Sequence, residues 1–128
     1  MTLIKRILMI SVSFTILNVW LLRFNKSTIF RGGNASDMLS EFHAYGLSEG
    51  MLYTVGTIKV LLAILLLLGI VYSKLVKPSI LAISILMISA IYFHISISDE
   101  IIKSVPALII LIFSLTIYFM DVREKVEG

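Results

Sequence analysis

Lys59 is the residue in this sequence best placed to do chemistry, because it lies well inside a long apolar run that starts near Glu49. About ten residues of helix, or roughly 15 Å, separate the two positions, which puts Lys59 near the middle of a membrane-spanning helix. A lysine at that depth costs on the order of 2.5 kcal/mol or more unless it meets a partner or water, so it indicates a functional site. Alternatively, its side chain snorkels or is satisfied by neighbouring carbonyls.

Four further polar residues are candidates for the same ligand-binding site: Asn18, Tyr92, His94 and Asp99. Asn18, His94 and Asp99 fall in the same half of the bilayer as Lys59, so they could line one polar cavity open to the outside. Tyr92 belongs to a polar stripe that lies roughly opposite His94 on the helical wheel, so these two side chains cannot face the same neighbour. In the alternative interpretation, His94 is a hydrogen-bonded anchor near the membrane interface.

Other kinds of chemistry find no support in the sequence. There is no cysteine, which excludes disulfides and thiolate metal sites. His43 and His94 are the two histidines and do not form an i, i+4 pair, so we expect no metal site. No motif for hydrolysis, phosphate binding or dinucleotide binding is present, and no acidic residue lies within an apolar run. An enzyme of conventional type and a carboxylate-dependent proton-coupled exporter are therefore disfavoured.

The elements that must position these residues are membrane-spanning helices. The chain has 128 residues, of which 59% are apolar, and a mean hydropathy of +1.02. A soluble domain of this size could not bury that much apolar surface. Lysines and arginines gather at the ends of the apolar runs, as they do in membrane proteins, and nothing indicates nucleic-acid binding.

Four spans are predicted, each close to the roughly 20 residues that a helix needs to cross the hydrocarbon. They cover residues 3–22, 49–72, 78–98 and 104–120. Ser48 is a suitable N-cap for the second span, and Pro78 and Pro106 suit the first turns of the third and fourth. The first run is too long and lacks the cleavage site expected of a signal peptide. The predicted fold is an all-α integral membrane four-helix bundle, with residues 1–128 as a single domain.

The long connection between the first two spans contains a short amphipathic segment, residues 36–46. Ser36 could cap its start and Gly46 its end. Its apolar residues recur at helical spacing on one face, so this helix should lie in the membrane interface or fold back over the bundle. Phe42 and Tyr45, on that face, are candidates for docking a partner. An ordered surface loop is the alternative.

Orientation follows from the basic residues, which are in excess on the cytoplasmic side of membrane proteins. Six lie at the termini and in the second connection: Lys5, Arg6, Lys74, Lys77, Arg123 and Lys125. Four lie on the other side: Arg23, Lys26, Arg31 and Lys103. The excess places both termini in the cytoplasm, with the protein in the cell membrane.

Small and polar residues recur at helical spacing within each span and are expected to mark the surfaces where helices pack together. The predicted stripes are Ser11, Thr15 and Asn18; Gly56, Lys59 and Ala63; Ser89, Tyr92 and Ser96; and Ala107, Ser114 and Tyr118.

The sequence resembles the DoxX-like family of small four-span membrane proteins. The resemblance covers Leu3 to Met120 and is carried by an ordered set of landmarks: Tyr45-Gly46-Leu47-Ser48, Val55-Gly56-Thr57-Ile58-Lys59, Ala63, Gly69, Pro78, Met87, Ala90, His94, Asp99 and Pro106-Ala107. It implies a four-helix membrane fold, and some relatives are membrane subunits of quinone-linked or other oxidoreductase complexes. It also implies a polar site at Lys59 and His94. Many relatives have a basic residue just after the histidine, where this chain has Ile95-Ser96-Ile97-Ser98.

Three hypotheses follow for the function. The first is an accessory membrane subunit that binds a quinone-like or lipid-like molecule in an inter-helix cavity, with no catalysis of its own. The second is a purely structural or partner-docking protein, whose partner would be another membrane or redox-complex subunit. A small-solute carrier is the least favoured.

Overall fold

The computed structural model describes residues 1–127, and every regular element in that range is helical. The long helices are α1 (Leu3–Leu17), α3 (Glu49–Leu68), α4 (Val76–Ser96) and α5 (Val105–Glu127), and the short α2 is Met38–Ala44. A π-helical turn, Asn18–Leu22, extends α1, and 3-10 turns Ser73–Leu75 and Ile101–Ser104 precede α4 and α5. The four long segments in the described range are apolar and long enough to cross a membrane.

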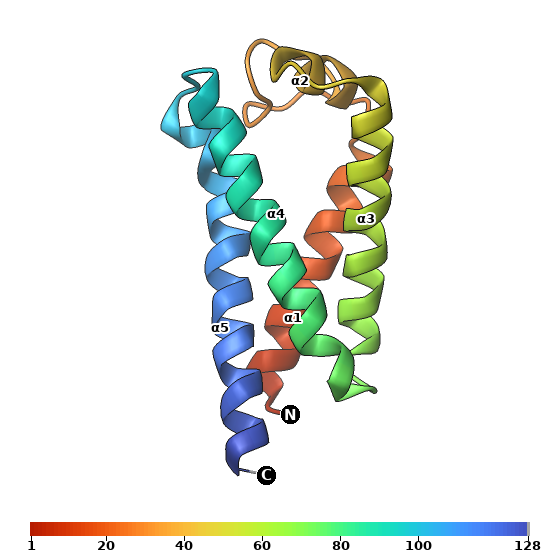
Figure 1. Cartoon of the computed structure of the whole chain (residues 1–128), viewed down its shortest axis with the longest axis vertical. Helices are drawn as coiled ribbons and strands as arrows, with labels where there is room; N and C mark the ends of the chain where they lie inside the picture. The colour runs from red at the N-terminus through yellow and green to blue at the C-terminus, as the bar shows by residue number, and fades with distance from the viewer. Residues whose placement is uncertain (128) are drawn as a thin grey trace.

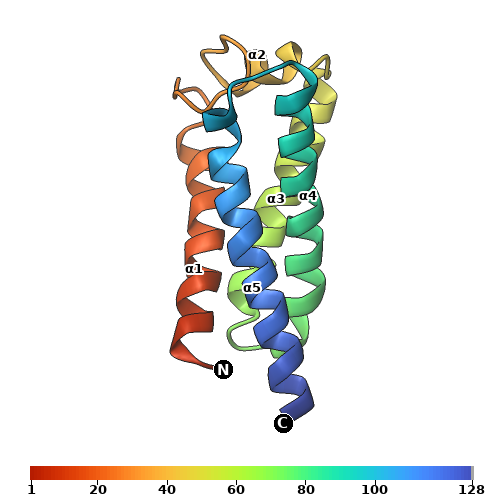
Figure 2. The ribbon, with the colours of Figure 1, turned by 90° about the vertical axis from the view of Figure 1, so that its left-hand side faces the viewer.

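The four long helices run up and down in sequence order, and each packs against two neighbours. Helix α1 contacts α3 and α5, and α4 contacts the same two helices. Figures 1 and 2 show α2 lying across one end of the bundle, while both chain termini lie at the opposite end. The fold is thus the predicted all-α four-helix bundle, with one end covered by the short helix.

Two span boundaries differ from the predictions by more than two residues. Helix α3 ends at Leu68 instead of Tyr72, because the chain turns at Gly69 and makes a 3-10 turn before α4. Helix α5 continues to Glu127, whereas the predicted fourth span ended at Met120.

The charged extension of α5 is helical because its carboxylates are paired with the start of α1. The Lys5 ammonium lies 2.9 Å from Asp121 Oδ1 and 2.7 Å from Glu124 Oε2. The side chains of Lys5 and Asp121 are 0% and 1% exposed. A third ion pair joins Asp121 to Lys125. This cluster fastens the two terminal helices together.

The structure confirms the predicted amphipathic helix, which is α2, but its N-cap differs from the prediction. Asp37, not Ser36, caps it, because the Asp37 carboxylate accepts a hydrogen bond from the Ser40 backbone N–H while Ser40 Oγ bonds back to the Asp37 backbone. Gly46 follows the helix with a φ of +82°, a conformation that favours glycine. The helix folds back over the bundle, with Met38 and Phe42 buried.

The predicted packing stripes are correct for α3 and α5 and wrong for α1 and α4. Gly56, Ala63, Ala107 and Ser114 are buried. By contrast, the polar residues Thr15, Tyr92 and Ser96 are exposed. Serine and threonine tolerate an apolar surrounding when the hydroxyl donates to a carbonyl of its own helix. Thr15 does so to Ser11, Ser89 to Ile85 and Ser96 to Phe93.

Candidate functional site

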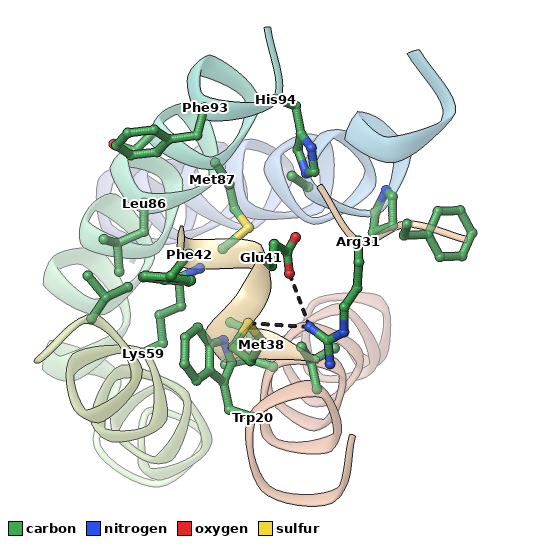
Figure 3. Close-up of a pocket in the computed structure, with 18 of the residues that line it drawn as sticks. Trp20, Arg31, Met38, Glu41, Phe42, Lys59, Leu86, Met87, Phe93 and His94 are labelled. Carbon is green, nitrogen blue, oxygen red and sulfur yellow. Dashed lines mark hydrogen bonds and ion pairs between the residues drawn. The ribbon is translucent and has the colours of Figure 1, made fainter. Parts of the chain in front are cut away.

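A cavity of about 630 Å³ lies beneath α2, inside the end of the bundle that α2 covers (Figure 3). All four long helices, α2 and the loop before α2 contribute to its lining. Helices α3 and α4 contribute one face each, with Met51, Val55 and Lys59 on the first and Leu86, Ala90 and Phe93 on the second. Most of the lining is therefore aliphatic or aromatic, which is typical of a site for an apolar molecule.

Trp20 forms part of the cavity wall where α1 meets α3. Its ring is 9% exposed and packs edge-on against Phe42 of α2, with 5.9 Å between the ring centroids. Trp20 can approach this closely because residue 56 is glycine: a Cβ there would lie 2.6 Å from the indole. The π-helical turn at Asn18–Leu22 contains Trp20, and such turns are frequent at functional sites.

Lys59 projects into the cavity from α3, one turn beyond Gly56 (Figure 3). Its Nζ lies 5.3 Å from the centroid of the Trp20 ring, within the range of a cation–π contact. Within residues 1–127, Lys59 makes no ion pair and its ammonium no hydrogen bond. An aromatic face stabilises an ammonium by less than its lost hydration, so this cation retains unused donors.

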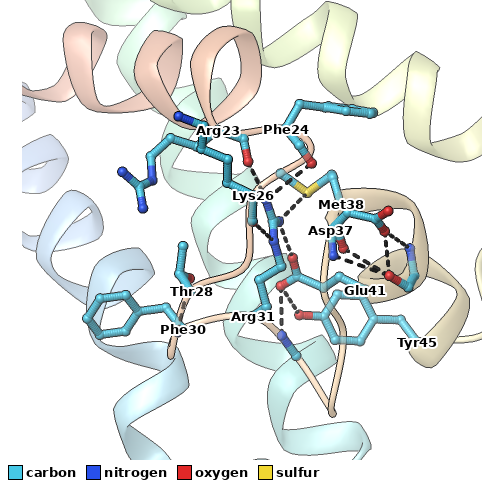
Figure 4. A network of polar contacts seen from close by, with 12 residues as sticks. Arg23, Phe24, Lys26, Thr28, Phe30, Arg31, Asp37, Met38, Glu41 and Tyr45 are labelled. Carbon is cyan, nitrogen blue, oxygen red and sulfur yellow. Dashed lines mark hydrogen bonds and ion pairs between the residues drawn. The ribbon is translucent and has the colours of Figure 1, made fainter.

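The first polar cluster at the roof of the cavity centres on Glu41 of α2 (Figure 4). Arg31 donates to Glu41 Oε2 at 3.0 Å, and this ion pair is buried, with side chains 5% and 11% exposed. Glu41 Oε1 accepts from the Gly32 backbone N–H and from the Tyr45 hydroxyl, each at 2.9 Å. Arg31 also donates to the backbone carbonyls of Lys26, Arg23 and Phe24. The loop before α2 is thereby fastened to α2 and to the end of α1.

The second polar cluster continues from Tyr45 to the end of α4. The Tyr45 hydroxyl lies 3.3 Å from His94 Nδ1, and His94 Nδ1 donates to Asp99 Oδ2 at 2.7 Å. Asp99 Oδ1 accepts from the Gly33 backbone N–H at 2.9 Å, and Lys103 donates to the Gly33 carbonyl. Charged and polar side chains therefore form a continuous chain from Arg31 to Lys103 across the covered end of the bundle.

The two clusters shift the pKa of Tyr45 and of Asp99 in the directions that preserve the hydrogen bonds between these polar side chains. Burial, together with the adjacent Glu41 carboxylate, raises the pKa of the Tyr45 hydroxyl, so it remains a donor. Burial would raise the pKa of Asp99, but hydrogen bonds from His94 and the Gly33 N–H and the charge of Lys103 hold it below its usual value. Asp99 is thus an anion at neutral pH.

Since the pKa of Asp99 is lower in the folded protein, its contribution to stability is present above its usual pKa of 3.8 and is lost as pH falls through the folded value. We expect Asp99→Asn to lower the free energy of unfolding by about 1.5 kcal/mol at pH 7. Melting curves of wild type and variant between pH 7 and pH 3 should converge toward the acid end. A difference that stays constant over that range would contradict the assignment.

The structure brings together most of the residues predicted for the site. Asn18, Lys59 and His94 line the same cavity. Asp99 does not line it but is paired with His94. Tyr92 does not lie there: its side chain is 63% exposed on the outer face of α4. As the helical wheel indicated, it faces away from His94, and we leave it out of the candidate site.

The candidate docking residues point inward. Phe42 is 7% exposed and packs on Trp20, while Tyr45 lies against Phe93 and His94. Both line the cavity, so little of either side chain is presented to a partner on the outer surface.

Sequence reasoning missed Trp20, Arg31 and Glu41 as members of this site. A tryptophan near the end of an apolar run is typical of the membrane interface, and Arg31 and Glu41 lie in a connection where charges are usually solvated. A usable signal was the presence of both charges in the one long connection, ten residues apart, with Arg31 before the amphipathic helix and Glu41 within it. Within residues 1–127, no group of His, Asp and Glu side chains is arranged to hold a metal ion.

Four apolar helices arranged as an antiparallel bundle, with a largely apolar cavity at one end, define a multi-pass helical membrane protein. The chain belongs to the DoxX-like family, whose model matches residues 16–117. The matched segment contains every residue that lines the cavity, from Ile16 to Ile110. No curated protein and no solved structure matches the chain.

Proposed function

We propose that this DoxX-like protein binds a quinone-like or lipid-like amphiphile in the cavity beneath α2, with the polar head of the ligand at Lys59. The observation that carries the proposal is an apolar cavity of about 630 Å³ into which a lysine projects, with no ion pair or hydrogen bond to its ammonium from residues 1–127. Ligand pockets commonly have such a volume, with apolar walls and a few placed polar groups.

The apolar walls support a ligand with an extended apolar part. Val55, Leu86, Ala90 and Phe93 line the side of the cavity between α3 and α4, two helices that diverge toward α2 in Figure 1. Met51, also in the lining, is 45% exposed, so the cavity reaches the outer surface of the bundle near the start of α3. A molecule dissolved in the membrane could reach Lys59 from this side.

The test is to purify the protein in a mild detergent and to identify bound small molecules by extraction and mass spectrometry. Wild type should retain a quinone or lipid at a reproducible molar ratio. Ala90→Phe, which places a ring in the cavity, should lose most of it, and Lys59→Met should lose at least part. Ile88→Phe is the matched control, because Ile88 is 55% exposed on the same helix and does not line the cavity. Equal retention in all four proteins would contradict the proposal.

We further propose that the protein acts as an accessory subunit of a larger membrane complex in the cell membrane. The carboxylate of Glu41 and the imidazole of His94 in the cavity lining are already engaged, with Arg31 and Asp99 respectively, so the lining is better suited to binding than to proton transfer. Any redox chemistry on the ligand would then belong to a partner. Affinity purification from membranes, compared between wild type and Ala90→Phe, should recover a membrane or redox-complex subunit in stoichiometric amount. Recovery of the chain alone under mild extraction would argue against the accessory role.

We also propose that both termini and the α3–α4 connection face the cytoplasm, as the distribution of basic residues indicates. Because the sequence has no cysteine, single cysteines can be read without background. Ser27→Cys and Glu100→Cys, both at exposed positions near α2, should react with an impermeant thiol reagent on intact cells. Lys74→Cys and Glu127→Cys should react after the membrane is opened. The reverse pattern would invert the orientation.

A further inference from the structure

Positively charged side chains outnumber negatively charged ones in the cavity lining. Four cationic side chains belong to the lining: Arg23, Arg31, Lys59 and Lys103. Glu41 is the carboxylate that belongs to it. A site with this balance attracts negative charge, provided that the cations are not already neutralised by groups outside the lining.

Three of the four cations already have a carboxylate partner or are solvated by water. Arg31 pairs with Glu41 at 3.0 Å, and Lys103 lies 3.9 Å from the Asp99 carboxylate. Arg23 is exposed at the end of α1, where water can solvate it. Lys59 has no carboxylate partner within the described residues, and it is the deepest of the four in the membrane-spanning part of the bundle.

Neither nearby carboxylate is free to move to Lys59. Glu41 already accepts hydrogen bonds from Arg31, the Gly32 N–H and the Tyr45 hydroxyl. Asp99 is held by His94 and the Gly33 N–H. Withdrawing either carboxylate would leave buried donors unpaired, which costs more than one new ion pair returns.

From this charge balance we infer that the ligand carries an anionic head, a carboxylate or a phosphate, that pairs with the Lys59 ammonium over the face of Trp20. This inference rests on the proposed function and specifies the class of ligand. An anionic head supplies the missing countercharge, and an ammonium binds an anion more strongly than a neutral carbonyl because both partners then carry a full charge. The apolar tail extends along Val55, Leu86 and Ala90 toward the membrane.

Trp20 provides a direct readout, because the sequence has one tryptophan and its ring lies in the cavity wall beside Lys59. Bromine atoms quench indole fluorescence at contact. The protein is placed in phosphatidylcholine nanodiscs and titrated with 9,10-dibromostearate or with its methyl ester, which has the same tail and no charge. Trace amounts of brominated phosphatidylglycerol and brominated phosphatidylcholine form a second pair that differs in head charge.

The variants are Lys59→Met, Lys59→Arg and Lys26→Met. Lys59→Arg retains the charge, and Lys26 is an exposed lysine outside the cavity lining that serves as the matched control.

Saturable quenching by dibromostearate is expected in wild type, Lys59→Arg and Lys26→Met, with an apparent affinity about ten-fold weaker in Lys59→Met. The methyl ester should bind about ten-fold more weakly than the acid and should not distinguish the variants. If brominated phosphatidylglycerol quenches and the free acid does not, the anionic head comes from a phospholipid; the opposite result assigns it to a free fatty acid.

Two results separate this inference from the proposed function. If the methyl ester quenches as well as the acid, with the same affinity in Lys59→Met, the head is not anionic, although the cavity still binds an amphiphile. If none of the four brominated compounds quenches Trp20 saturably, both the anionic head and the cavity as a binding site are contradicted.

Discussion

Replacing Glu41 by alanine is expected to detach α2 from the bundle and to lower the free energy of unfolding by roughly 3–5 kcal/mol. Glu41 accepts from the Arg31 guanidinium, the Gly32 N–H and the Tyr45 hydroxyl (Figure 4). The alanine would leave a buried arginine without its countercharge. Removing one member of a buried ion pair is far more destabilising than removing an exposed one.

The measurement combines thermal unfolding in detergent with hydrogen exchange of α2. In the Glu41→Ala protein the backbone amides of residues 38–44 should lose their protection, while those in the middle of α5 keep it. Glu100→Ala is the control, because Glu100 is exposed and its side chain makes no ion pair within residues 1–127. If Glu41→Ala and Glu100→Ala unfold at the same temperature with equal α2 protection, Glu41 does not hold the helix over the cavity.

The second large effect is expected at the opposite end of the bundle. Asp121→Leu should lower the free energy of unfolding by about 3 kcal/mol, because it leaves the buried Lys5 ammonium with Glu124 as its remaining carboxylate partner. It should also free the last turns of α5, whose charged residues are helical through these contacts.

The double variant Lys5→Met/Asp121→Leu separates the ion pair from the packing. Buried ion pairs are often replaceable by apolar side chains of similar size, so the double variant should recover most of the loss. Thermal unfolding of the wild type, the two single variants and the double variant completes the cycle. Additive single effects, with the double variant the least stable of the four, would show that Lys5 and Asp121 act independently.

The spans and two residues of the candidate site, Lys59 and His94, could be predicted from the sequence because the order of apolar and polar residues along the chain is enough to identify them. Long apolar runs indicate helices in lipid, whatever they pack against. Lys59 and His94 interrupt such runs, and a polar side chain there must find a partner or a cavity. Both line the cavity beneath α2.

The remaining features depend on contacts between distant segments. Lys5 and Asp121 are 116 residues apart, and each looks like an ordinary flanking charge until the two helix ends meet. The same is true of Glu41, which resembles a solvated residue of a loop helix. The prediction for Tyr92 was wrong because a tyrosine in an apolar run was assumed to belong to an inner polar face. Its amphipathic ring lies instead at the outer surface of α4.

The most direct test of the account is an experimental structure of the protein extracted with its native lipids. The account predicts elongated density in the cavity beneath α2, with one end in contact with Lys59 Nζ beside Trp20 and the other directed between α3 and α4. A cavity filled by protein side chains, with the Lys59 ammonium paired to a carboxylate of the protein itself or turned out toward the membrane surface, would contradict it.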